Sequence, residues 1–434
     1  MPIRLDTETS DFPQRFADFL GSKREASVDV QDQVSAIIAE VRARGDAALI
    51  DLSRKFDRVD LAALGLRVTD AELDAALASI PPETRTALEF AKGRIESHHA
   101  RQRPHDETYT DAAGVTLGQR WTSVDAVGLY VPGGTAAYPS SVLMNAVPAQ
   151  VAGVPRIVMV VPAPDGQIAP LVLAAARLAG VHEVYRVGGA QAVAALAFGT
   201  ETIRPVDKIV GPGNAYVAQA KRQVFGKVGI DMVAGPSEVL ILADGNANAD
   251  WIAADLLAQA EHDTAAQSIL VTDSADLLAR VDAAVDGMLA TLPRAEIARA
   301  SWRDHGALIK VKSLDEAPAL VDRVAPEHLE IQTEAPDALA ERIRHAGAIF
   351  VGAYTPEAIG DYVGGTNHVL PTARSARFSS GLGVLDFMKR TSILKLNAEA
   401  LGALGPAAVR LAEVERLQAH GRSVSIRTNA GGGQ

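Results

Sequence analysis

Short apolar runs of strand length alternate along most of the chain with stretches in which apolar residues recur every three or four positions. Such runs, bounded by glycine, proline or charged residues, predict buried strands at 126–131, 156–161, 183–187, 208–210, 238–243, 268–271, 307–311 and 348–351. Strands that alternate with helices predict parallel sheets covered by helices on both faces, and this number of strands predicts two sheets.

The two ends of the chain depart from this alternation. Residues 1–22 predict a short N-terminal arm, and residues 31–103 have a helical period throughout. Residues 374–434 predict an appendage that ends in a helix, with Pro406 at its start and Gly421 just past its end. Apolar Ala407, Leu411 and Val414 share one face of that helix, so we expect this face to pack on another surface.

Composition excludes several classes of protein. A net charge of −11 without any basic run argues against nucleic acid as a partner. No uncharged apolar run reaches membrane-spanning length, and residues 1–6 lack the apolar core of a signal peptide, so we expect no membrane contact and a cytoplasmic location. There are 0 cysteines, so any metal must be held by His, Asp, Glu or amide oxygen, and no thiol can carry an aldehyde.

Three predicted strands end in glycine turns, at 130–135, 187–191 and 211–214. Glycine lets backbone N–H groups approach a phosphate, and a following helix N-terminus favours an anion. None of the turns fits G-x-G-x-x-G, and tight connections need glycine for geometry alone. Because all three are expected at the carboxyl ends of strands in one sheet, a nucleotide and a purely structural role both remain open.

The stretch 259–263 contains the first candidate metal ligands. We expect Gln259 and His262 to close a helix that begins near Trp251, and at a spacing of three both side chains leave one helix face. An amide oxygen and an imidazole nitrogen can form half of a metal site. The alternative is a polar helix end with a histidine near the negative end of the helix dipole.

Three further stretches carry candidate acids, bases and ligands. Glu327 and His328 are adjacent in a proline-bounded turn, and a carboxylate beside an imidazole offers two proton acceptors. Asp361 and His368 lie in a glycine-rich segment after a strand, where either could bind a metal or substrate. Ser237 precedes a strand, where it equally suits a turn.

In the C-terminal helix, Glu415 and His420 stand near the end, where a histidine is favoured by the helix dipole alone. The remaining histidines singled out, at 98, 99, 105 and 182, are interpreted as structural.

Taken together, these segments resemble the histidinol dehydrogenase family. The resemblance is carried, in the family's order and over nearly the whole chain, by residues 128–134, 187–200, 207–217, 231–240, 257–263, 326–333, 360–372 and 413–420. One departure is small: Gly364-Gly365 stands where some members have Ser-Gly.

The resemblance implies an NAD-dependent enzyme with one Zn²⁺ per subunit that oxidises L-histidinol through an aldehyde to L-histidine, reducing two NAD, in the last steps of histidine biosynthesis. It implies the zinc ligands Gln259, His262, Asp361 and His420. The implied substrate-binding residues are these four together with Ser237, Glu327, His328, His368 and Glu415. Within that set, His328 is the implied general base and Glu327 the implied activator of water. The implied NAD contacts are Tyr130, Gln191 and Asn214.

The fold implied by the resemblance is α/β, with two incomplete Rossmann-like parallel-sheet domains, small N- and C-terminal arms and an intertwined homodimer with shared active sites. The implied divisions are a 1–22 arm, a discontinuous 23–110 and 237–380 domain with most zinc and substrate residues, a 111–236 NAD-binding domain, and a 381–434 dimerisation arm. Two other hypotheses are a relative that oxidises a different amino or sulfonated alcohol, and a metal-stabilised binding protein for an imidazole compound.

Overall fold

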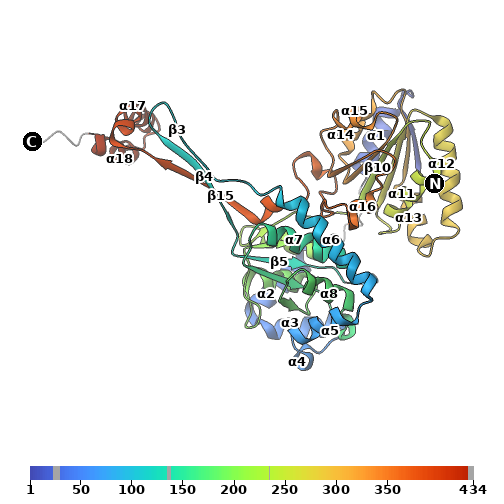
Figure 1. Cartoon of the computed structure of the whole chain (residues 1–434), viewed down its shortest axis with the longest axis horizontal. Coiled ribbons are helices and arrows are strands. Elements are labelled where there is room, and N and C mark those ends of the chain that lie inside the picture. The colour runs from blue at the N-terminus through green and yellow to red at the C-terminus, as the bar shows by residue number, and fades with distance from the viewer. Residues whose placement is uncertain (23–29, 134–137, 234, 429–434) are drawn as a thin grey trace, which may run out of the picture.

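The structure, a computed structural model, describes residues 1–22, 30–133, 138–233 and 235–428. It has two lobes, each built on a six-stranded sheet, and a long arm that projects from the first lobe (Figure 1). Gly134 and Thr135 of the first predicted glycine turn, and Ala234 before Ser237, lie outside the described residues.

The first lobe contains the sheet β2-β7-β6-β5-β8-β9, in which only β2 runs antiparallel. Its strands are β2 (Arg67–Val68), β5 (Ala126–Tyr130), β6 (Arg156–Val160), β7 (Glu183–Tyr185), β8 (Lys208–Val210) and β9 (Gly229–Ile230). Buried Val, Ile, Leu and Met side chains cover both faces, which is why these strands read as continuous apolar runs in the sequence.

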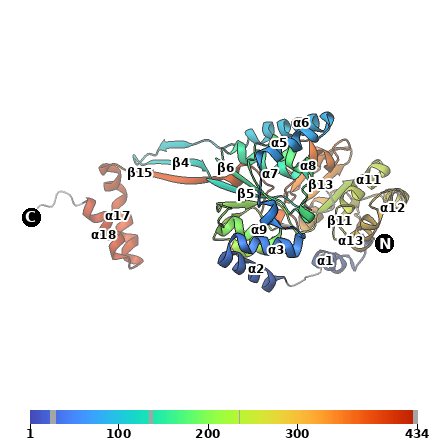
Figure 2. The same ribbon diagram turned by 90° about the horizontal axis from the view of Figure 1, so that it is seen from below.

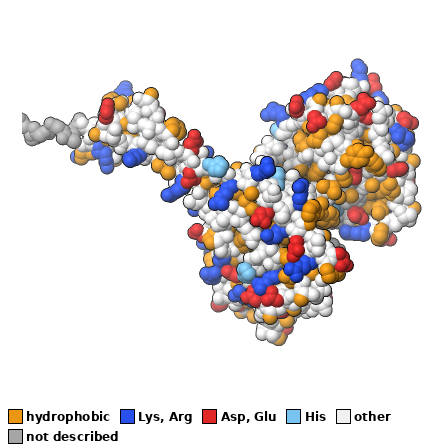
Figure 3. Space-filling model, viewed as in Figure 1, with side chains coloured by type: hydrophobic (Ala, Val, Ile, Leu, Met, Phe, Trp, Pro, Cys, Tyr) orange, Lys and Arg blue, Asp and Glu red, His pale blue; other side chains and the backbone are white. Residues whose placement is uncertain are grey.

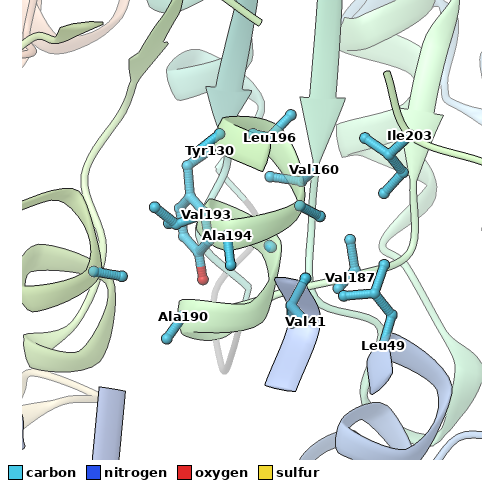
Figure 4. Packing of buried hydrophobic residues seen from close by; sticks show 14 of the residues in the cluster. Val41, Leu49, Tyr130, Val160, Val187, Ala190, Val193, Ala194, Leu196 and Ile203 are labelled. Carbon is cyan, nitrogen blue, oxygen red and sulfur yellow. The ribbon is translucent and has the colours of Figure 1, made fainter. Parts of the chain in front are cut away.

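Helices cover both faces of this sheet. One face carries α2 (Gln31–Arg44), α3 (Asp46–Asp57), α4 (Leu61–Leu64), α9 (Gly189–Phe198) and α10 (Ala215–Val224). Figure 4 shows Val41 of α2, Leu49 of α3 and Leu196 of α9 in this core. The other carries α5 (Asp70–Ser79), α6 (Pro82–Ala100), α7 (Pro139–Val151) and α8 (Pro170–Leu178), with the short turn η1 (Pro164–Gly166) nearby. The expected grouping of 23–110 with 237–380 is therefore wrong in its first half, because the described residues from 30 to 100 share the cores of the first sheet.

The second lobe contains an all-parallel sheet in the order β1-β12-β11-β10-β13-β14. Its strands are β1 (Ile3–Asp6), β10 (Glu238–Ala243), β11 (Gln267–Thr272), β12 (Ala307–Lys310), β13 (His328–Gln332) and β14 (Ala348–Val351). The two sheets have the same strand order. A central strand, β5 or β10, has the next two strands of the sequence on one side and the following two on the other, as in dinucleotide-binding folds.

Helices again lie on both sides of the second sheet. One face packs against α11 (Ala249–Ala260), α12 (Ala275–Leu289) and α13 (Ala295–His305), and the other against α1 (Phe12–Gly21), α14 (Ala317–Val324) and α15 (Pro336–Ala340). The N-terminal segment is thus part of this lobe rather than a separate arm, since β1 pairs with β12 and Phe16 is buried in the core.

The arm is a three-stranded antiparallel ribbon with two helices at its tip (Figure 2). In the space-filling view it is a narrow projection from the two lobes (Figure 3). The ribbon consists of β3 (Glu107–Thr110), β4 (Thr116–Ser123) and β15 (Met388–Lys395), and the tip of α17 (Ala398–Val414) and α18 (Gln418–Thr428). Two short turns, η2 (Ser375–Arg377) and η3 (Val384–Phe387), lead into the ribbon. None of the described helices is both long and apolar enough to cross a membrane.

The predicted C-terminal helix was wrong in both of its bounds. The first helix begins at Ala398 because the Asn397 side chain accepts a hydrogen bond from the backbone N–H of Ala400, and Pro406 lies inside it. Arg416, at φ 60°, takes the left-handed conformation that ends this helix, and Gly421 lies within the next one.

Candidate active site

Two strands of the second sheet begin at the centre of the predicted site. Residue 239 pairs with His328 in the register of β10 and β13, so Glu238 and Glu327 lie at the same edge of the sheet. The backbone N–H of Glu238 donates to Oε2 of Glu327 at 2.9 Å, and the carbonyl of Glu238 lies 3.0 Å from Nδ1 of His328. A carbonyl only accepts hydrogen bonds, so Nδ1 carries the proton and Nε2 presents a lone pair.

The free nitrogen of His328 is placed for proton transfer. Nε2 is buried, has no hydrogen-bond partner among the described residues, and lies 3.8 Å from Oδ1 of Asp361. The pKa of His328 is lowered to about 4, chiefly by burial and to a smaller extent by the nearby His262 and His368, whereas the hydrogen bond to the Glu238 backbone acts in the opposite direction. The imidazole is therefore neutral near pH 7 and able to accept a proton.

Glu327 has the opposite electrostatic character. Burial raises its pKa well above the usual value, the charges of Glu238 and Asp361 raise it further, and hydrogen bonds from the Glu238 backbone and the Ser237 side chain oppose this. A carboxylate with a raised pKa is a stronger base than an exposed one, which suits the activation of water.

Gln259 lies in the last turn of α11 with a relative exposure of 0%, and neither atom of its amide has a hydrogen-bond partner in the described part of the chain. A buried amide left unpaired costs about 1–3 kcal/mol, so this side chain is expected to meet a ligand. The prediction that His262 lies on the same helix is wrong, because α11 ends at Ala260. The backbone N–H of His262 instead donates to the Gln259 carbonyl at 3.2 Å, in the turn that follows the helix.

Asp361 supplies a carboxylate to the same region. It lies on the short helix α16 (Glu357–Tyr362) rather than in an extended loop, and burial raises its pKa to about 6. An amide oxygen, an imidazole and a carboxylate are a chemically suitable donor set for zinc. Among the described residues, no group of three or more His, Asp or Glu side chains is arranged so that it could hold a metal ion.

His368 connects this region to the first lobe. Its Nδ1 lies 3.1 Å from the backbone oxygen of Asp361, and its Nε2 lies 3.3 Å from the hydroxyl of Ser141 on α7. Next to it, the Asn367 side chain donates to the carbonyl of Met144 on the same helix at 2.7 Å. The glycine-rich segment therefore spans the two lobes, and His368 stands between Asp361 and the first lobe.

Glu415 and His420 are not brought to this site by their own chain. Both are exposed at the tip of the arm, which projects away from the lobes. Leu411 and Val414 of α17 are 63% and 66% exposed, so the described residues of this chain do not cover the apolar face that was predicted to pack on another surface.

Several acidic residues near the site were not predicted. Oε2 of Glu357 lies 3.7 Å from Nδ1 of His328, and its backbone N–H donates to Glu330 at 2.8 Å. Gln332 then donates to both Glu330 and Asp255, at 2.9 Å each. The pKa of Glu330 is raised to about 8 by burial and by the charge of Asp255. The available signal in the sequence was the charged residue Glu330 between the apolar residues Leu329 and Ile331 of this strand.

The predicted cofactor residues gather at one edge of the first sheet. Tyr130 ends β5, Gln191 lies in the first turn of α9 after β7, and Asn214 caps α10 after β8, so all three lie at the carboxyl ends of strands of one sheet. The phenol oxygen of Tyr130 accepts the N–H of Gly189 at 3.0 Å and so connects two of the turns. Such an edge, where the strand order reverses, is where open parallel sheets bind nucleotides.

Comparison with known proteins agrees with this geometry. The family model described as histidinol dehydrogenase matches residues 21–428. A histidinol dehydrogenase of Bradyrhizobium diazoefficiens is 67% identical over 429 residues, covering 99% of this chain and 100% of the relative. One of Rhodospirillum rubrum is 66% identical over 432 residues, with coverage of 99% and 100%. The crystal structure of histidinol dehydrogenase from Elizabethkingia anophelis superimposes with a TM-score of 0.94 at 36% identity, covering 98% of each chain.

Proposed function

The chain belongs to the histidinol dehydrogenase family, and from this premise we propose that it oxidises L-histidinol through L-histidinal to L-histidine, with two NAD reduced and one zinc ion per subunit. These are the closing steps of histidine biosynthesis. The observation that carries the proposal is the arrangement of His328, whose proton on Nδ1 is bound to the carbonyl of Glu238 and whose Nε2 faces the site without a partner in the described residues.

The proposed metal ligands are Gln259, His262 and Asp361 of one chain and His420 of the partner subunit. The unpaired buried amide of Gln259 is the structural support for this set. Bound zinc would supply positive charge that orients the amine and imidazole of the substrate. His368, Ser237 and the partner subunit's Glu415 would contact the polar groups of the substrate.

The first oxidation needs a base for the hydroxyl proton. Nε2 of His328 would accept that proton while the neighbouring carbon loses a hydride, for which NAD is the acceptor. Because the imidazole is buried and its pKa is about 4, it is unprotonated at neutral pH and ready for this role.

The second oxidation begins with addition of water to the aldehyde. Glu327, whose pKa is raised by burial, would take a proton from the attacking water and form the aldehyde hydrate. The proton that His328 took in the first oxidation would pass to the aldehyde oxygen as the hydrate forms. His328 would then be free to accept the hydroxyl proton of the hydrate as the second hydride leaves. Each oxidation therefore removes one hydride and one proton from the substrate, and the added water supplies the second oxygen of histidine.

Tyr130, Gln191 and Asn214 would contact the cofactor at the carboxyl edge of the first sheet. The Asn214 oxygen is already used, since it accepts the N–H groups of Tyr216 and Val217 at 3.1 and 3.2 Å. Its amide nitrogen is the atom of this side chain that would remain for a cofactor oxygen. The buried side chain of Gln191 lies against Gly189, two residues earlier in the same turn.

Rates of the two half-reactions test these roles. The variant His328→Ala should slow histidinol oxidation by about 10²–10⁴. The variant Glu327→Gln should slow chiefly the conversion of histidinal to histidine, because only that step needs activated water. The matched control is Glu334→Gln, an exposed glutamate two residues beyond the end of the same strand, which should leave both rates unchanged. Wild-type oxidation of histidinal by Glu327→Gln would refute the assignment.

A further inference from the structure

A fully buried ion pair stands beneath the third glycine turn of the first lobe. Lys221 of α10 and Asp231, which follows β9, form a salt bridge with side-chain exposures of 2% and 1%. Removing two charges from water is costly, and such a pair is often no more stabilising than apolar residues of the same size. Stability alone therefore does not explain why the protein has an ion pair at this position.

Both side chains of the ion pair form hydrogen bonds with the backbone of the same residue, Gly211. Oδ2 of Asp231 accepts the backbone N–H of Gly211 at 2.8 Å, and Nζ of Lys221 donates to the Gly211 carbonyl at 2.9 Å. Gly211 has φ of 109°, and a Cβ there would lie 2.1 Å from the carbonyl oxygen of Tyr130. The first residue of the turn is thus fixed on three sides, at a position that only glycine can occupy.

The fixed residue determines where the rest of the turn lies. Gly211 directly follows β8, and three residues later Asn214 begins α10 with its side chain as the N-cap. Asp231 also stands where the chain leaves the first sheet, and the connection from there reaches Ser237 at the start of β10. The ion pair therefore ties the turn at the cofactor edge to Asp231, at the end of the first sheet.

We propose that Lys221 and Asp231 are positioning residues for the cofactor, which hold the 211–214 turn in the conformation that receives NAD. This inference rests on the proposed binding of NAD at this edge. Neither side chain would touch NAD, since both are buried beneath the turn. Their loss should weaken cofactor binding while leaving the acid–base chemistry at His328 in place.

The test is the double variant Lys221→Met with Asp231→Leu, which removes both charges together and so leaves no unpaired charge in the core. The Michaelis constant for NAD and the dissociation constant for NADH, measured by fluorescence without histidinol, should each rise about tenfold, as expected for lost charge-assisted hydrogen bonds. The kcat at saturating NAD and the KM for histidinol should remain within about twofold of wild type, because neither interaction touches the substrate.

The matched control is Arg156→Met with Glu183→Leu, which removes an ion pair at the opposite, amino-terminal edge of the same sheet. Isosteric Asp231→Asn provides the same readout should the double variant be insoluble. NAD and NADH constants equal to those of the control, in folded and active protein, would overturn the inference. Wild-type protein that fails to reduce NAD with histidinol would instead overturn the proposed function, so the two failures are distinguishable.

Discussion

Replacing Gln259 by leucine should change stability in opposite directions with and without metal. Its amide is completely buried and has no partner among the described residues, so the metal-free protein carries the cost of an unpaired polar group. That cost is about 1–3 kcal/mol for a buried donor or acceptor. Gln259→Leu should therefore stabilise the metal-free protein by about 1–3 kcal/mol, because a similar volume is kept without polar atoms.

With bound metal, the wild-type protein should become more stable than Gln259→Leu. A ligand that binds only the native state stabilises it by RT ln(1 + [L]/Kd), or about 2.7 kcal/mol at one hundred times Kd. Gln259→Leu lacks one proposed ligand, so zinc should stabilise it less than wild type. Urea unfolding at fixed pH and protein concentration, first with a chelator and then with added zinc, measures both free energies of unfolding.

The matched control is Gln267→Leu in the neighbouring strand β11, where the amide is also buried but has a partner. Its Nε2 donates to the carbonyl of His305 at 3.3 Å, so its removal should cost about 0.5–1.5 kcal/mol whether or not zinc is present. The reasoning would be refuted if Gln259→Leu destabilised the metal-free protein as the control does, or if zinc stabilised Gln259→Leu as much as wild type.

Two further predictions concern the shared site and the buried acids. If the site is completed by the partner's arm, co-refolding inactive His262→Ala with inactive His420→Ala should restore about a quarter of wild-type activity. Half of the dimers are then mixed, and half of the sites in mixed dimers are intact. Well-folded mixed dimers without activity would reject the shared site. The pKa of Glu330 is raised to about 8, so the folded protein keeps a proton on this carboxyl that the unfolded chain releases above about pH 4.5. The free energy of unfolding should therefore fall as pH rises toward 8, by up to about 1.4 kcal/mol per pH unit. Urea unfolding between pH 6 and 8 should show a shallower decline for Glu330→Gln, and parallel declines would contradict this.

The buried strands could be predicted from sequence because their position in a doubly covered sheet leaves a strong apolar signal. Strands β8, β10 and β14 occupy the residues expected of them. The arm ribbon left no such signal: β15 is exposed along nearly all of its length, so neither face required apolar residues. Strand β1 was missed for a different reason, since its partner β12 lies about three hundred residues away in sequence.

The site could be predicted in part, because its polar residues interrupt apolar patterns at the starts of strands. Ser237 immediately precedes β10, as the local sequence indicated. Glu327 immediately precedes β13, a strand that was not predicted, and His328 is the first residue of that strand rather than part of a turn. The approach of Ser237 and Glu327 to one another depends on strand pairing, which local pattern does not encode. The inward placement of Glu357 follows from the packing of α16, and the proposed place of His420 in a site depends on a second chain.

The most direct test of the proposed function is the stoichiometry of NAD reduction by the purified protein. With zinc present and NAD in excess, a limiting amount of L-histidinol should yield two NADH and one L-histidine per molecule consumed, and removal of the metal by a chelator should abolish the reaction until zinc is restored. A yield of one NADH with accumulated aldehyde, an absence of NADH, or full activity in protein shown to be metal-free would contradict it.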